Sequence, residues 1–243
     1  MKRFLLLTSA SVIVAASAAF ALPVTPTYTT FGSLPAVTFN GAGNPNNAVA
    51  ITTIVDGANT ITLGLQAQQR YLNPPLVNNG AGVFTASPGA NLQGPGPTLG
   101  STWNFDFYAN VAGPGSVANY TFELIYSFLP NVTPTGVINL NNANIAVGGS
   151  PTVKTLQDSE NLTFGFLATP VAGVIAPPPG VYNPYTDGVY GFELLAFKSS
   201  TLIGQSAIDV SVPETSSTAL LFGLGLISLF AFGYKQNARR ITS

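Results

Sequence analysis

Apolar and polar side chains alternate with a period of two along several segments of the chain. The clearest alternation runs from Trp103 to Val111, and a second runs from Tyr120 to Phe128. This period places one set of side chains on each face of a β-strand, so both segments predict strands with one buried face. The same reasoning predicts further strands at residues 48–55, 60–65, 136–140, 162–167, 189–197 and 206–212.

Segments rich in glycine, proline and asparagine separate these strands. Between the first two lies Gly113-Pro114-Gly115-Ser116, which predicts a hairpin connection. Residues 71–100 and 176–180 predict loops by their composition. No amphipathic helix of ten or more residues is predicted before Ala219. The sequence therefore predicts an all-β fold in which two sheets pack as a sandwich.

One segment resembles the tyrosine corner of immunoglobulin-like domains, and it reads Asp187-Gly188-Val189-Tyr190-Gly191-Phe192. In those domains a tyrosine entering the penultimate strand donates a hydrogen bond from its hydroxyl to the backbone. Phe192 occupies the position of the cysteine of antibody domains. The resemblance implies an immunoglobulin-like β-sandwich whose last two strands are residues 189–197 and 202–212. The alternative is an ordinary Asp-Gly turn ahead of a strand.

The amino-terminal residues have the pattern of a secretory signal peptide. Two basic residues precede an apolar stretch from Phe4 to Val14, and Ala19-Phe20-Ala21 forms a small-x-small cleavage site. The pattern predicts cleavage after Ala21, so residues 1–21 are left out of the predicted fold. The alternative is a membrane anchor that is not cleaved.

The carboxyl-terminal residues 212–243 combine a polar motif, an apolar run and a basic end. The motif is Val212-Pro213-Glu214-Thr215, the apolar run covers residues 219–234, and the basic residues are Lys235, Arg239 and Arg240. A helix over this run spans roughly 24 Å, against about 30 Å for a bilayer core, and bilayer thinning accommodates the difference. A buried core helix is the alternative. Basic residues so close to the chain end favour a membrane helix with this end in the cytoplasm.

This arrangement resembles the PEP-CTERM sorting tail of Gram-negative bacteria. In that family an integral-membrane peptidase, the exosortase, recognises Pro-Glu-Pro ahead of a transmembrane helix and an arginine-rich end. Pro213 and Glu214 match the motif, and Thr215 replaces the second proline. The resemblance implies an exported protein, anchored in the inner membrane with residues 22–211 as a periplasmic ectodomain. After processing by an exosortase-type partner, its destination would be the cell surface or the exopolysaccharide matrix.

Composition excludes several classes of function. Charged residues make up 7% of the chain, against about 25% in typical soluble proteins. Residues 22–211 carry three basic and eight acidic side chains, a balance of −5, which disfavours binding to nucleic acid. The chain has no cysteine and no histidine. It therefore forms no disulfide, no Ser-His-Asp or Cys-His catalytic site, and no zinc site with such ligands.

Carboxylates are the remaining groups for acid–base chemistry. Asp106 and Glu123 lie on the polar faces of the two predicted hairpin strands, and a glycosidase needs two carboxylates about 5 to 10 Å apart. A solvated sheet face that happens to carry two acids is the simpler interpretation. Asp158-Ser159-Glu160-Asn161 and Asp187 carry oxygen ligands suited to calcium, but the spaced loop of a calcium site is absent. Solvated loop acids are the alternative there, so no metal or other cofactor is predicted.

Four tyrosines lie at predicted loop or polar-face positions that suit contact with sugar rings, namely Tyr71, Tyr108, Tyr182 and Tyr185. The whole pattern predicts an exported surface or matrix protein that is not an enzyme and has a structural or adhesive role. Two alternatives remain: a carbohydrate- or ice-binding module, and a glycan hydrolase that uses carboxylates. Only fragments of a Thr-x-Thr array, such as Thr27-Tyr28-Thr29-Thr30, favour ice binding.

Overall fold

The computed structural model describes residues 23–71, 75–91 and 100–214. Within these residues the chain forms fourteen strands, one α-helix and two 3-10 helices. The strands are β1 (Thr30–Gly32), β2 (Val49–Asp56), β3 (Asn59–Gln69), β4 (Val77–Asn78), β5 (Val83–Thr85), β6 (Ala90–Asn91), β7 (Gly100–Ser101), β8 (Trp103–Ala112), β9 (Thr121–Tyr126), β10 (Gly136–Asn139), β11 (Thr155–Glu160), β12 (Ile175–Ala176), β13 (Gly188–Lys198) and β14 (Thr201–Val212). The helices are α1 (Leu140–Ala146), η1 (Val117–Asn119) and η2 (Gly165–Ala168). The prediction of an all-β fold is confirmed.

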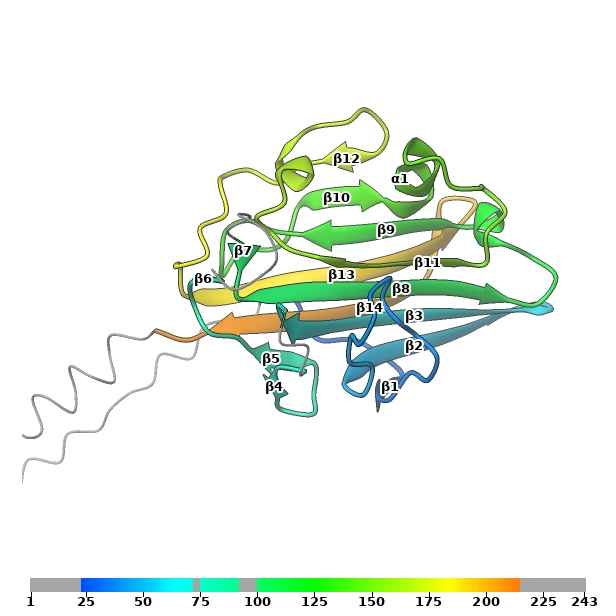
Figure 1. The fold of residues 1–243 in the computed structure, drawn as a ribbon. Coiled ribbons are helices and arrows are strands. Elements are labelled where there is room, and N and C mark those ends of the chain that lie inside the picture. The colour runs from blue at the N-terminus through cyan, green and yellow to red at the C-terminus, as the bar shows by residue number, and fades with distance from the viewer. Residues whose placement is uncertain (1–22, 72–74, 92–99, 215–243) are drawn as a thin grey trace, which may run out of the picture.

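The strands form two large sheets that pack face to face (Figure 1). The first sheet has the order β1-β2-β3-β8-β11, and the second has the order β12-β10-β9-β13-β14-β5-β4. All neighbours are antiparallel except β14 and β5, which pair in parallel. A third, two-stranded sheet joins β6 to β7.

The core lies between the two sheets and is built from the apolar half of each alternating strand. In β8 the inward residues include Trp103 and Phe105, and in β13 they include Tyr190 and Phe192. The rings of Phe105 and Phe192 stack across the interface with centroids 4.5 Å apart. Such contacts between sheets explain why a period of two is so regular in these segments.

The predicted hairpin between residues 103–111 and 120–128 is wrong. These segments form β8 and β9, which belong to different sheets, because the chain crosses from one sheet to the other between them. Gly113 has a φ of 112°, which glycine tolerates, and the Asn59 side chain accepts a hydrogen bond from the backbone N–H of Gly115. The buried side chain of Val117 in η1 then anchors the crossing at the end of the sandwich.

The remaining strand predictions are confirmed with shifted boundaries, with one exception. Residues 162–167 form no strand; they lead into η2, and the strand of this region is β11, which starts at Thr155. Within the described residues no helix is long and apolar enough to span a membrane. The predicted signal peptide (1–21) and transmembrane helix (219–234) lie outside the described residues.

Candidate functional site

The predicted sorting motif begins at Val212, the last residue of β14. Strand β14 pairs with β13 as far as Val212, which lies opposite Gly188 and is buried. Pro213 and Glu214 follow directly and are exposed. Thr215, the basic residues Lys235, Arg239 and Arg240, and the cleavage-site residues Ala19 and Ala21 lie outside the described residues.

The hydrogen bond expected of a tyrosine corner is present, and it lies beside the end of β14. The hydroxyl of Tyr190 donates a hydrogen bond to the backbone oxygen of Thr186 at 3.1 Å. The Trp103 ring packs against Tyr190 and Phe192, with centroid distances of 5.8 and 6.0 Å. Burial raises the pKa of Tyr190, so its hydroxyl stays protonated and available as a donor.

Asp106 lies in a buried polar network on the outer face of the first sheet. Gln66 donates a hydrogen bond to its carboxylate at 2.7 Å, and Gln68 donates another at 3.1 Å. Gln68 also donates to the hydroxyl of Ser159 at 3.0 Å. Burial raises the pKa of Asp106 to about 7, although hydrogen bonds from Ser159 and the two glutamines partly oppose this. Asp106 lies on the polar face of β8, as predicted. It is buried rather than exposed to solvent, because the segment around Pro45 covers this face.

Asp106 and Glu123 therefore do not form a catalytic pair. Asp106 faces outward from the first sheet, whereas Glu123 faces outward from the second sheet, where β9 lies. The hydrophobic core separates the two carboxylates, because their strands belong to opposite layers of the sandwich. The glycosidase proposal built on these two residues is wrong.

A groove with a volume of about 630 Å³ lies at the open edge of the sandwich. On one side it is bordered by β11, and on the other by α1, β10 and β12. Its apolar lining includes Phe107 and Phe166, and the Phe166 side chain is 45% exposed. Two carboxylates, Asp158 and Glu160, project into it from β11. Because they are two residues apart on one strand, they share the same face.

The two groove carboxylates differ in how readily they ionise. Burial, the nearby charge of Asp158 and that of Asp106 raise the pKa of Glu160 to about 8. Burial also raises the pKa of Asp158. At neutral pH, Glu160 is therefore largely protonated and can donate a hydrogen bond from its carboxyl group, while a carboxylate at Asp158 can only accept. Together the two side chains can donate a hydrogen bond to, and accept hydrogen bonds from, the hydroxyl groups of a polyol.

Two of the oxygen groups considered for calcium are used in other ways. The Ser159 hydroxyl belongs to the Asp106 network, and the Asn161 side-chain oxygen accepts hydrogen bonds from the Ser101 N–H at 3.1 Å and from the Thr163 hydroxyl at 2.6 Å. In the described part of the chain, no three His, Cys, Asp or Glu side chains gather closely enough to hold a metal ion.

The four predicted sugar-contact tyrosines divide into two groups. Tyr108 is half-buried against a small outer cluster with Phe39, and Tyr182 packs on Trp103 and donates to the Ser101 hydroxyl at 3.0 Å. Tyr71 and Tyr185 are exposed, by 40% and 68%. The Arg70 guanidinium lies over the Tyr71 ring, 4.7 Å from its centroid, and neither Tyr71 nor Tyr185 lines the groove.

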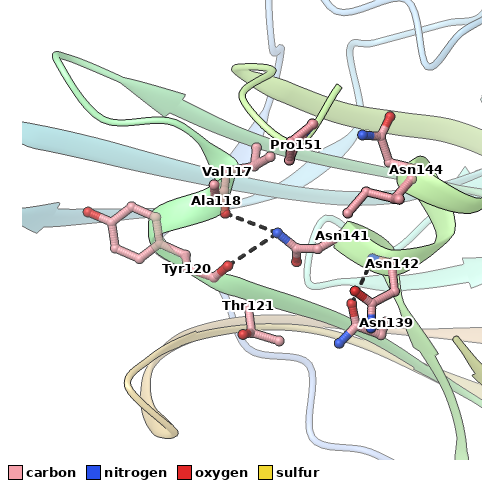
Figure 2. Close-up of a pocket in the computed structure, with 10 residues that line it drawn as sticks. Val117, Ala118, Tyr120, Thr121, Asn139, Asn141, Asn142, Asn144 and Pro151 are labelled. Carbon is pink, nitrogen blue, oxygen red and sulfur yellow. Dashed lines mark hydrogen bonds between the residues drawn. The ribbon is translucent and has the colours of Figure 1, made fainter. Parts of the chain in front are cut away.

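A second, smaller hollow of about 320 Å³ is rich in asparagine (Figure 2). The asparagine side chains around it form hydrogen bonds mainly with backbone N–H and C=O groups. Asn141 donates to the backbone oxygens of Val117 and Tyr120 and accepts from Phe122 N–H. Asn139 caps α1 by accepting a hydrogen bond from the Asn142 N–H. The hollow is therefore explained as a structural junction between η1, β9 and α1.

Threonine side chains form a small array on the outer face of the first sheet. Thr53 lies opposite Thr62, and Val55 lies opposite Thr60, across β2 and β3. On the next strand, the positions opposite the β3 threonines are Asn110 and Ala112. Sequence inspection missed this cross-strand arrangement because the two Thr-containing segments are separated by a turn. The array is two strands wide and does not form the repeated lattice expected of an ice-binding surface.

Comparison of the chain with protein-family models, with curated proteins and with solved structures finds no match.

Proposed function

We propose that this chain is an exported, non-enzymatic protein of the envelope or exopolysaccharide matrix of a Gram-negative bacterium, with a structural or adhesive role. The observation that carries the proposal is the position of the Pro-Glu motif relative to the fold. Val212 is buried as the last residue of β14, and Pro213 and Glu214 are exposed immediately beyond it. A membrane peptidase can therefore reach the motif while the sandwich stays folded.

In this proposal, residues 1–21 direct export and residues 219–234 hold the precursor in the inner membrane. The ectodomain then lies in the periplasm until an exosortase-type peptidase acts on the tail. Support comes from the joint occurrence of leader, motif, apolar run and basic end in one sequence. The weakly charged ectodomain suits contact with neutral polysaccharide.

We propose further that the sandwich is immunoglobulin-like in the broad sense. Three features support this: the Tyr190–Thr186 hydrogen bond, the packing of Trp103 against Phe192, and the adjacency of β9, β13 and β14 in one sheet. The opposite sheet differs, because β2 and β3 form a hairpin and the chain then contributes β4 and β5 to the second sheet before it returns as β8 beside β3. Sandwiches of this group share architecture without always sharing topology.

The test is the fate of a Glu214→Ala variant in the producing bacterium. Wild-type protein is expected in the matrix fraction with a lower mass than the precursor. The variant is expected to stay in the membrane fraction at precursor mass, and Thr215→Pro is expected to increase the released share. Glu123→Ala, a carboxylate on the far outer face of β9, serves as the matched control and should be released normally. Release of Glu214→Ala at the wild-type level would contradict the proposal.

The groove at the sandwich edge favours carbohydrate binding as a second candidate function. An exposed aromatic ring, Phe166, lies beside a protonated Glu160 and a second carboxylate, Asp158. Sugar rings stack on aromatic faces, and their hydroxyls both donate and accept hydrogen bonds. The groove is large enough for a small saccharide.

Retention of the purified protein on the bacterium's own exopolysaccharide tests this second candidate. Phe166→Ala is expected to weaken binding about 5- to 10-fold through loss of ring stacking. Tyr185→Ala removes an exposed ring away from the groove and should bind as the wild type does. Equal retention of all three proteins would show that the groove is not the sugar site.

A further inference from the structure

The carboxyl group of Glu160 lies without a hydrogen-bond partner in the groove at the edge of the sandwich. The residue is partly buried at the end of β11, and it lines the groove. Among the described residues, no hydrogen bond joins this carboxyl to another group. Asp158, which also lines the groove, accepts a hydrogen bond from the Ser159 backbone N–H at 2.9 Å. Because burial without a partner is costly, a ligand that supplies a donor to Glu160 gains binding energy there.

The groove also lacks a positive charge to complement its two acidic side chains. None of its lining residues is basic, and α1, β10, β12 and η2 carry no titratable side chain. Asp106, on the outer face of β8, adds a further negative charge nearby. The three basic side chains of the described ranges are engaged elsewhere: Arg70 donates to the Tyr71 hydroxyl, Lys154 donates to the Gly113 backbone oxygen, and Lys198 pairs with Asp56. Within the described part of the chain, nothing supplies the missing positive charge.

The size and lining of the groove fit an organic cation better than a metal ion. Its volume is about 630 Å³, whereas one water molecule occupies only about 30 Å³ in the liquid. The wall opposite β11 is largely apolar and includes Ile138, Leu140 and Ile175. Phe166 adds a ring that is 45% exposed, and the faces of such rings attract ammonium groups. A molecule with an apolar body and one positive group therefore complements both sides of the groove.

We propose that the groove binds a glycan through the ammonium group of an amino sugar, which pairs with Glu160 and Asp158 while the sugar ring packs against Phe166. The inference rests on the proposed carbohydrate binding at this groove, and it names the class of sugar. An ammonium group carries a positive charge and three hydrogen-bond donors, so one group can pair with both carboxylates. The two residues are two positions apart on one strand, which places their Cα atoms about 7 Å apart and lets both side chains reach one ammonium.

Acetylation of the amino sugar removes the features that the groove recognises. An N-acetyl sugar has one amide N–H in place of the ammonium and carries no charge, although its ring can still pack against Phe166. Burial, followed by the charges of Asp158 and Asp106, raises the pKa of Glu160 to about 8 in the empty groove. An ammonium beside Glu160 favours the ionised carboxylate, whereas an N-acetyl group does not. The two sugars therefore differ in charge pairing at one nitrogen only.

The test compares two trisaccharides that differ only in acetylation, the β-1,4-linked trimers of glucosamine and of N-acetylglucosamine. Full-length protein in detergent is titrated with each trimer by calorimetry at pH 7. We expect wild type to bind the glucosamine trimer about 10- to 100-fold more tightly than the acetylated trimer. Glu160→Gln combined with Asp158→Asn should abolish this preference and leave binding of the acetylated trimer intact. Glu123→Gln, on the outer face of the second sheet, is the matched control and should keep the preference.

The outcomes separate this inference from the carbohydrate binding on which it rests. Equal affinity of wild type for the two trimers, or a preference that survives in the double variant, would overturn the inference. So would failure to bind either trimer by a protein whose retention on the exopolysaccharide still depends on Phe166, because the groove would then take another class of sugar. Retention that does not depend on Phe166 would instead refute carbohydrate binding at the groove.

Discussion

The Tyr190 hydroxyl donates a hydrogen bond to the Thr186 backbone oxygen at 3.1 Å, and this bond fixes the turn that leads into β13. Two residues before Tyr190, Gly188 pairs with Val212, the last residue of β14. The Tyr190–Thr186 hydrogen bond and the last residue of β14 therefore lie close together at one end of the sandwich. Of the described residues, Pro213 and Glu214 continue beyond this paired end of β14, and both are exposed.

Removing the corner hydroxyl should weaken the fold. Tyr190→Phe keeps the buried ring but leaves the Thr186 oxygen without this donor, so we expect a loss of about 1 to 2 kcal/mol in the free energy of unfolding. Urea denaturation measures it. Tyr185→Phe removes an exposed hydroxyl on the residue just before the Thr186 acceptor and should change stability by less than about 0.5 kcal/mol. Equal effects of both variants would contradict a special role for the corner.

Burial of Asp106 should make stability depend on pH. Its pKa is about 7 in the folded chain and about 3.9 when unfolded, so the folded state binds more protons between these values. The contribution of Asp106 to the free energy of unfolding is therefore largest below pH 4. It falls by roughly 2 to 4 kcal/mol as the pH rises towards 7. Asp106→Asn should remove that part of the decline, and Glu123→Gln should keep it. A parallel decline in Asp106→Asn and wild type would show that Asp106 does not cause it.

The stacked pair in the core gives a packing prediction. Phe192→Ala removes a fully buried ring that stacks on Phe105, and should cost about 3 to 5 kcal/mol because a cavity remains. Phe166→Ala truncates a ring that is nearly half exposed and should cost much less. Calorimetric melting of the two variants measures the difference. Similar melting temperatures would mean that the Phe105–Phe192 contact does not hold the two sheets together.

Periodicity located most long strands, but not how they pair. The alternation in residues 103–111 and 120–128 is set by burial of one face, and it is the same whether two strands share a sheet or lie in opposite sheets. Strand β11 was missed because it contributes few apolar side chains, with Leu156 as its main buried residue. The Tyr190–Thr186 hydrogen bond could be predicted because it joins residues only four positions apart in the sequence.

Candidate site residues were harder to predict than strands. The polar face of β8 is solvated in a simple sandwich, but here a long segment before β2 covers it, and Gln66 donates to the Pro45 backbone oxygen. The apolar residues of that segment, such as Val37 and Phe39, follow no strand or helix period, so the burial of Asp106 could not be predicted from the pattern. The groove was missed for a related reason. Its walls come from β11, α1 and β12, which meet only in the folded chain.

The most direct test of the proposed export and processing is mass spectrometry of the terminal peptides of this protein recovered from the extracellular matrix. The account predicts a chain that begins at Leu22 and ends between Pro213 and Ser217. A terminus at Arg240-Ile241-Thr242-Ser243, found only in membranes, would contradict processing and would indicate a permanently anchored surface protein.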